Sequence, residues 1–156
     1  MKKETLAYFA GLLDGEGCIY IHSGQKGKHR GDFWQLRVTM VNTNPTPLVR
    51  AKALFGGTIV KTHKGGDYGN IYWRPTFTWC VVAKVATRFL MQVLPFLIIK
   101  KQEAEEALAF KRIQDSSLYK RRSEERKNIL DNYVIKLKEL KRINFNLPID
   151  ERTPMG

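Results

Sequence analysis

Apolar and polar side chains alternate with a period of two in several stretches of the chain, and such alternation is typical of β-strands with one buried face. On this basis we expect strands at four places: 18–23, 33–42, 58–64 and 70–82. A basic, glycine-containing segment separates the first two, and a glycine-rich segment separates the last two. The sequence therefore predicts two hairpins, with their turns at 24–31 and 65–69.

Helical patterns occupy much of the remaining chain. Helices are expected in five places: 5–13, 45–55, 83–95, 100–115 and 123–144. The first is expected to end at the glycines that follow it, and a glycine pair also follows the second. The order helix, hairpin, helix, hairpin, helices predicts an α+β fold, in which helices cover one face of a sheet.

The distribution of charge adds information about the partner. The chain of 156 residues is long enough for one domain, and it carries a net charge of +12. Between Gly17 and Gln102 lie thirteen Lys and Arg residues but only two acidic ones, Asp32 and Asp67. This concentration indicates one basic face rather than a uniformly basic surface. Nucleic acid is the partner that such a face predicts.

The sequence argues against membrane, secreted and zinc-binding classes of protein. The apolar stretch 89–99 is well short of the roughly 20 residues that a transmembrane helix needs. Acidic residues stand where a signal peptide would need its cleavage site. Cys18 and Cys80 lack the spacing of a zinc site or a disulfide framework. We therefore expect an intracellular protein with two free thiols and no membrane partner.

Small residues and two carboxylates gather at the first helix and its end. Gly11 follows Ala7 by four residues, which creates a strip of small side chains that lets another helix approach closely. Asp14 and Glu16 flank Gly15, and a carboxylate beside a backbone carbonyl suits Mg²⁺, which keeps most of its water ligands. The same residues also fit an acidic turn, in which Asp14 caps the helix and Glu16 is merely solvated.

The run of residues 8–19, YFAGLLDGEGCI, closely resembles the signature of the LAGLIDADG homing endonucleases. The predicted order of elements is also similar to the αββαββα core of that family. The resemblance covers about residues 4–111, and leaves 112–144 as a C-terminal helical extension and 145–156 as an irregular tail of the same domain. It implies a curved antiparallel sheet that lies on DNA, with helices on its other face. Because the motif occurs once, it also implies a homodimer.

The resemblance implies roles for individual residues. Glu16 matches the last acidic position of the motif, which binds metal at the scissile phosphate, and the carbonyl of Gly15 is the neighbouring ligand. In this chain Glu replaces the Asp of the motif. Lys100 follows a proline-containing segment that looks like the one leading to the basic active-site residue of the family. The implied cofactor is Mg²⁺, with Mn²⁺ as a substitute.

Three of these positions leave alternatives open. Lys100 and Lys101 lie in the first turn of a predicted helix, where the dipole disfavours cations by roughly 0.3 to 1 kcal/mol each, unless neighbouring glutamates make them ordinary surface residues. Asn44 stands where relatives often carry a Gln that positions water, and it is also a good helix cap. A position that is typically basic falls on Leu48, so either Arg50 takes that role or the role is absent.

On the strands, the polar parity is expected to face DNA and the apolar parity to pack on the helices. The third strand is ambiguous, because Lys61 shares its parity with Ile59 whereas Thr62 shares its parity with Val60. Arg and Gln pair naturally with guanine and adenine in the major groove, whereas basic loop residues contact phosphates. Base reading is therefore expected from Gln35, Arg37 and Arg74, and phosphate contacts from Lys26, Lys28 and Arg30. The full set of DNA contacts also includes Tyr20, His22, Thr39, Lys61, Thr76 and Thr78. The expected dimer contacts are Ala7, Ala10, Gly11 and Asp14.

Together these features predict a site-specific, Mg²⁺-dependent endonuclease that cuts a long, pseudo-palindromic site in double-stranded DNA and leaves 3′ overhangs. It is expected to act at DNA in a prokaryotic cytoplasm or in an organelle that encodes its own intron. Two other interpretations use the same fold. One is an intron RNA-splicing maturase, whose partner is intron RNA, and the other is a DNA-binding regulator that does not cleave.

Overall fold

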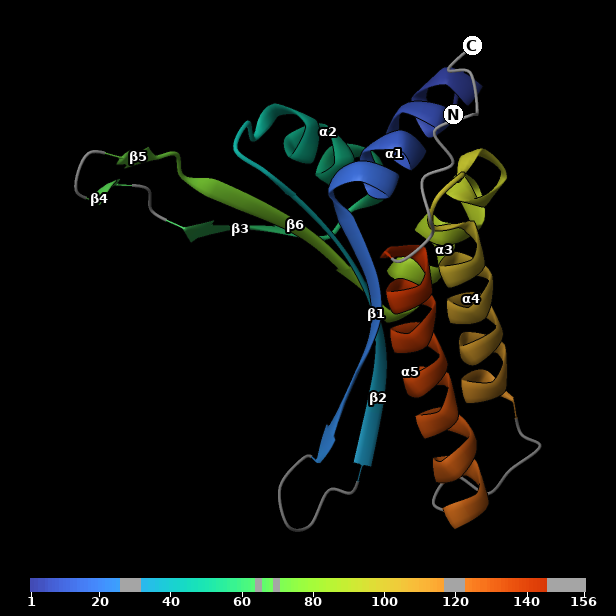
Figure 1. Cartoon of the computed structure of the whole chain (residues 1–156). Helices are drawn as coiled ribbons and strands as arrows, with labels where there is room; N and C mark the ends of the chain where they lie inside the picture. Colours follow the sequence, from blue (N-terminus) through green and yellow to red (C-terminus); the bar gives the residue numbers. More distant parts are fainter. Residues whose placement is uncertain (26–31, 64–65, 69–70, 117–122, 146–156) are drawn as a thin grey trace, which may run out of the picture.

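A computed structural model describes residues 1–25, 32–63, 66–68, 71–116 and 123–145 of the chain. Helices pack on one face of an antiparallel sheet (Figure 1), so the α+β class expected from the sequence is confirmed. The elements are α1 (Lys3–Glu16), β1 (Gly17–Gln25), β2 (Asp32–Asn42), α2 (Thr46–Phe55), β3 (Thr58–His63), β4 (Gly66–Tyr68), β5 (Ile71–Trp73), β6 (Thr76–Val82), α3 (Ala83–Val93), η1 (Leu94–Phe96), α4 (Lys101–Asp115) and α5 (Glu124–Phe145).

The main sheet has four antiparallel strands in the order β1–β2–β6–β3, and β4 pairs with β5 in a separate two-stranded sheet. β1 pairs with β2 from Gly17 to Gln25, but β6 pairs with β2 only over Arg37 to Asn42. Residues 21–25 and 32–36 therefore continue beyond the four-stranded region as a pair, which we call the β1–β2 ribbon. At the opposite end, β3 to β6 project away from α4 and α5 as an arm (Figure 1).

The strands alternate between a buried and an open face, as their sequence pattern predicts. Ile19 is fully buried and Ile21 is 7% exposed, and Leu36, Val38 and Met40 of β2 are fully buried. The intervening residues of β1 and β2 are partly or fully exposed. The buried parity packs on the helices, so the other parity forms one continuous open face of the sheet.

Aromatic side chains join the helices to the centre of the sheet. The rings of Phe55 from α2 and Trp79 from β6 both contact Phe89 of α3 edge to face, with centroids 4.8 and 5.1 Å apart. Phe9 of α1 meets Phe55 at 5.2 Å in the same geometry. Such rings bury large apolar areas and favour edge-to-face contact, so this cluster fixes α1, α2 and α3 against β6.

The chain between α2 and β3 passes very close to β6. The indole N–H of Trp79 donates to the carbonyl of Gly56 at 2.9 Å. Gly57 has a φ of +91°, and a Cβ there would lie 2.5 Å from the carbonyl oxygen of Cys80. The glycine pair that the sequence suggested as a helix stop is therefore also needed for close packing.

Three predicted boundaries are wrong. The segment 65–69, predicted as a turn, contains β4, which pairs with β5. α1 does not end at residue 13 but continues through Asp14 and Gly15 to Glu16, and the N–H of Gly17 donates to the carbonyl of Leu13. The predicted strand 70–82 is divided into β5 and β6 at Pro75, which has no N–H to contribute to a strand ladder.

α4 and α5 lie side by side behind the β1–β2 half of the sheet, and α2 packs on β3 and β6 (Figure 1). None of the helices in the described part of the chain is long and apolar enough to cross a bilayer.

The junction between β6 and α3 generates a stability prediction. Ala83 has a φ of +48°, a left-handed conformation that favours glycine. Ala83→Gly should raise the free energy of unfolding by about 0.5 to 1 kcal/mol, or the melting temperature by about 1 to 4 °C, in a thermal melt. The matched control is Ala53→Gly, at an exposed position inside α2, which should lower stability by about 0.5 to 1 kcal/mol. Equal losses in both variants would contradict the strain at Ala83.

Candidate active site and nucleic-acid interface

The end of α1 is tied to the segment that precedes α4 by the carboxylate of Asp14. This side chain is buried, and its Oδ2 accepts hydrogen bonds from the backbone N–H groups of Ile98 at 2.8 Å and Ile99 at 3.2 Å. Its Oδ1 accepts from the N–H of Lys100 at 2.9 Å. Asp14 therefore holds the backbone of the segment directly before α4 through charge-assisted hydrogen bonds, although it lies 86 residues earlier than Lys100.

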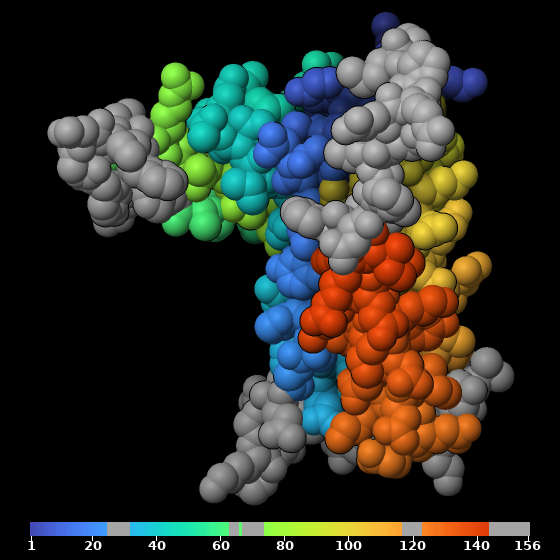
Figure 2. All heavy atoms as spheres, in the orientation of Figure 1, coloured from blue at the N-terminus to red at the C-terminus, as the bar shows by residue number. Residues whose placement is uncertain are grey.

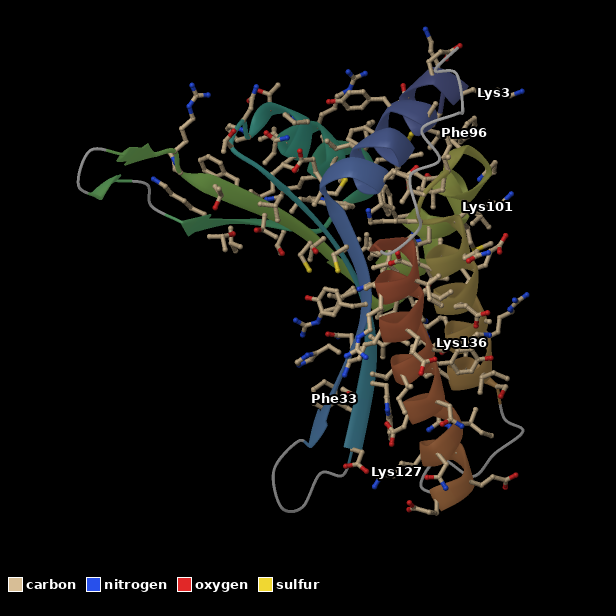
Figure 3. All side chains as sticks on the ribbon, viewed as in Figure 1. Lys3, Phe33, Phe96, Lys101, Lys127 and Lys136 are labelled. Atoms are coloured by element: carbon tan, nitrogen blue, oxygen red, sulfur yellow. The ribbon has the colours of Figure 1, made fainter. Side chains whose placement is uncertain are left out.

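Lys100 returns to the same place with its side chain. It stands directly before α4, and its ammonium donates to the backbone carbonyl of Asp14 near the C-terminus of α1. Unpaired carbonyls give that helix end a partial negative charge, which stabilises a cation. Lys101 points away from the sheet instead (Figure 3). The two adjacent lysines are thus distinguished by their environments.

The contact of Lys100 with the end of α1 brings it near the predicted metal ligands. Gly15 and Glu16 follow Asp14 directly in the last turn of α1, and both are exposed. A carboxylate and a helix-end carbonyl are hard oxygen donors of the kind that Mg²⁺ accepts, with water completing its coordination. Among the described residues, no cluster of three or more His, Cys, Asp or Glu side chains forms a closed metal site. The arrangement fits a partly hydrated ion bound by few protein ligands.

The remaining predicted active-site positions have structural contacts. The side-chain oxygen of Asn44 accepts from the N–H of Thr46 at 3.0 Å, so Asn44 forms an Asx turn directly before α2, whose N-cap residue is Pro45. Leu48 is fully buried in the core, whereas Arg50 on the same helix is exposed.

The open face carries most of the predicted DNA contacts in register. Tyr20 pairs with Arg37 across β1 and β2, and His22 pairs with Gln35. The Nε of Arg37 donates to the side-chain oxygen of Gln35 at 2.9 Å, which links two expected base readers. The face is hollowed between the ribbon and the arm (Figure 2). A concave sheet surface with polar and basic side chains suits a DNA duplex.

A row of small side chains crosses the middle of the open face. Cys18, Thr39 and Cys80 are aligned across β1, β2 and β6. Burial raises the pKa of the Cys80 thiol, and the nearby charge of Arg37 opposes this shift. Both cysteines are free thiols, as expected.

The arm shows a more varied arrangement. Thr76 and Thr78 are partly exposed, and the hydroxyl of Thr78 is hydrogen-bonded to that of Thr62 on β3. Lys61 pairs with Phe77, which packs on the core, so the register places Lys61 on the helix side. A shift in register follows Lys61. Arg74 is exposed between β5 and β6. The predicted phosphate contacts Lys26, Lys28 and Arg30 lie outside the described residues.

Two residues on or beside this face were not identified from the sequence. Helix α5 lies against β1 (Figure 2). The ammonium of Lys141 on this helix donates to the Sγ of Cys18 at 3.1 Å and lies 5.9 Å from the Tyr20 ring centroid. Its position on a helix gave no signal, because the docking of α5 decides where it points. The ring of Phe33 lies on the side of the sheet away from α5 (Figure 3), 5.3 Å from that of His22. Its shared parity with Gln35 was the available signal.

The small-residue strip of α1 is divided between surface and core. Ala7 and Gly11 are exposed, and a Cβ on Gly11 would meet no atom within 4 Å. Ala10 is fully buried and Asp14 is 8% exposed, both within their own chain. The accessible part of the strip therefore consists of Ala7 and Gly11, with Tyr8 beside them at 50% exposure.

The sequence matches no protein-family model and no curated protein. The structure, in contrast, is similar to solved homing endonucleases. With I-CvuI bound to its target, the TM-score is 0.71 at 18% identity, covering 88% of this chain and 82% of that one. With the archaeal intron-encoded I-Vdi141I bound to DNA, it is 0.68 at 16% identity, covering 90% and 86%. With the LAGLIDADG homing endonuclease I-LtrWI bound to target DNA, it is 0.60 at 16% identity, covering 83% of this chain but 42% of that one. The chain therefore has the fold of the LAGLIDADG homing endonucleases.

Proposed function

We propose that this protein is a site-specific endonuclease that hydrolyses phosphodiesters in double-stranded DNA. The observation that carries the proposal is the contact between Lys100 and the end of α1, since it brings a cation close to Gly15 and Glu16. These residues directly precede β1, whose open face carries expected DNA contacts. The proposed catalytic residues and the proposed DNA-binding surface therefore adjoin where α1 passes into β1. I-CvuI and I-Vdi141I, which share the fold, are described with a target and with DNA.

In this proposal Glu16 and the carbonyl of Gly15 hold Mg²⁺ or Mn²⁺. The ion, when bound, supplies Lewis-acid activation of the phosphate and lowers the pKa of bound water. The ammonium of Lys100 stabilises negative charge that develops on the phosphate oxygens during attack. Asp14 is a positioning residue, because its carboxylate holds the backbone of Lys100 rather than the substrate. The expected product carries 3′ overhangs.

The open face is proposed to bind the duplex. Arg37 and Gln35 present donors and acceptors that match guanine and adenine edges in the major groove. Their mutual hydrogen bond at 2.9 Å restrains both side chains before DNA arrives, which reduces the entropy lost on binding. The net charge of +12 supplies the attraction for phosphates, which Lys26, Lys28 and Arg30 are proposed to contact.

Two copies of the chain are proposed to form the active enzyme. Ala7 and Gly11 allow close approach of a second α1, and Tyr8 and Ile98, which is 86% exposed, provide adjoining apolar surface. One chain offers Glu16 once, whereas cleavage of a duplex requires chemistry on two strands. The chain also spans 42% of I-LtrWI, so two copies together approximate the length of that protein. A pseudo-palindromic DNA site would match the two-fold symmetry.

Cleavage of a random duplex library with Mg²⁺, followed by recovery of the cut sites, tests the proposed activity. Glu16→Gln and Lys100→Met should each lower the single-turnover cleavage rate by roughly a hundredfold or more, while DNA binding is largely retained. Glu105→Gln and Lys101→Met are matched controls at exposed positions of α4, and they should cleave at the wild-type rate. Unchanged cleavage by Glu16→Gln would overturn the assignment of that carboxylate. Binding without any cleavage by the wild type would identify a DNA-binding regulator instead.

The dimer generates a separate prediction. Gly11→Leu should make the chain monomeric in analytical ultracentrifugation, because the new side chain occupies the surface where the second α1 approaches. Leu also favours the helix over Gly by about 0.5 to 0.8 kcal/mol, and open space surrounds this position, so the monomer should stay folded. Glu139→Leu, at an exposed position of α5, is the control and should leave the dimer intact. A dimer that persists in Gly11→Leu would contradict packing through α1.

A further inference from the structure

The β1–β2 ribbon is fixed to α4 and α5 by side-chain hydrogen bonds. β6 no longer pairs with β2 before Arg37, so this part of β2 lacks a strand on that side. The indole N–H of Trp34 donates to the carboxylate of Asp131 on α5 at 2.7 Å. The side-chain amide of Gln114 on α4 donates to the backbone carbonyl of Trp34 at 2.6 Å. These contacts replace part of what a neighbouring strand would provide.

Further polar contacts extend this attachment. The guanidinium of Arg126 on α5 donates to the backbone carbonyl of Gln114 at 2.7 Å, which joins the two helices at the same level. The ammonium of Lys127 forms an ion pair with Asp32 at 3.2 Å, on the helix side of the ribbon (Figure 3). We call Trp34, Gln114 and Asp131 the ribbon clamp, since these three form the central contacts.

The same short stretch of β2 carries a clamp residue on the helix side and expected DNA contacts on the open face. Trp34 lies between Phe33 and Gln35 in sequence, and alternation places its side chain on the opposite face. Gln35 pairs with His22, and it also accepts the hydrogen bond from Arg37. A change in the height or tilt of Trp34 therefore moves the backbone that carries these side chains. Hydrogen bonds to base edges depend steeply on such placement.

We propose that Trp34, Gln114 and Asp131 are positioning residues for base recognition, which set the geometry of the ribbon on the DNA. The proposal rests on the DNA binding proposed above. It assigns to the C-terminal helices a part in specificity, although none of the clamp residues lies on the open face. The arm is supported differently, because α2 rather than α4 or α5 packs on β3 and β6. Loss of the clamp should therefore relax recognition by the ribbon and leave recognition by the arm unchanged.

The test is the discrimination among bases at each position of the selected DNA site. Asp131→Ala removes the acceptor of the Trp34 indole. Asp131→Asn keeps an acceptor oxygen and should therefore retain wild-type base discrimination. Trp34→Phe removes the donor but keeps an aromatic ring in the core, which guards against a loss of folding. The control is Lys136→Met, which breaks the 2.6 Å ion pair between α5 and Glu106 of α4 without touching the ribbon (Figure 3).

Gln35→Ala identifies the base pairs that the ribbon reads, and Thr78→Val identifies those that the arm reads. Asp131→Ala and Trp34→Phe should lower discrimination at the ribbon positions by roughly fivefold or more, with the arm positions unchanged. Asp131→Asn and Lys136→Met should match the wild type at both. A uniform loss at all positions, or unchanged discrimination at ribbon positions in Asp131→Ala, would overturn the proposal.

Hydrogen exchange separates failure of this proposal from failure of the proposed function. Amides of the ribbon should exchange faster in Asp131→Ala than in Asp131→Asn, with or without DNA. A wild-type chain that binds no DNA would refute the endonuclease, and the clamp would then have no part in base recognition. A wild-type chain that reads DNA normally, with identical exchange in both Asp131 variants, would refute the clamp alone.

Discussion

The hydrogen bonds that Asp14 accepts from three consecutive residues are the contact on which the candidate site depends. They join the last turn of α1 to the start of α4, two segments separated by more than eighty residues. A buried carboxylate is costly unless its oxygens are hydrogen-bonded, and charged acceptors make strong hydrogen bonds. The same contact fixes the backbone directly before α4 and holds Lys100 where its ammonium reaches the end of α1. Glu16 follows Asp14 by two residues in the same helix. The hydrogen bonds between Asp14 and Lys100 therefore hold Lys100 near Glu16 before any substrate binds.

The turn after α1 connects this site to the open face. Gly17 begins β1 directly after Glu16, and a Cβ there would lie 2.7 Å from the backbone carbonyl oxygen of Leu13. Only glycine allows the strand to leave the helix so closely. The side chains of Cys18, Tyr20 and His22 then follow on the open face, with Lys141 of α5 approaching the first two. The few residues at the end of α1 and the start of β1 would therefore set the position of bound DNA relative to the proposed metal ligands. A shift of β1 would disturb both binding and chemistry.

The sequence predicted the features that depend on neighbouring residues, such as which side chains of a strand are buried. The parity of Ile19 and Ile21 against Tyr20 and His22 was readable because one face of the sheet is buried and a period of two is unambiguous. The end of α1 was not, because glycines inside the helix suggested a stop that the distant contacts of Asp14 override. The place of Lys141 and the pairing of Trp34 with Asp131, 97 residues apart, depend on how α5 docks. No spacing in the sequence encodes that docking, and the shift in register that follows Lys61 is equally invisible to alternation.

The most direct test of the role of Asp14 is single-turnover cleavage of the selected DNA site by Asp14→Asn. The amide keeps one acceptor oxygen but turns an N–H donor toward backbone N–H groups, so the start of α4 should move relative to α1. We predict a folded variant that binds DNA with near wild-type affinity and cleaves roughly a hundredfold more slowly, because small displacements of positioned groups have effects of that size. A folded Asp14→Asn variant that binds and cleaves DNA at the wild-type rate would contradict the claim that this contact assembles the active site.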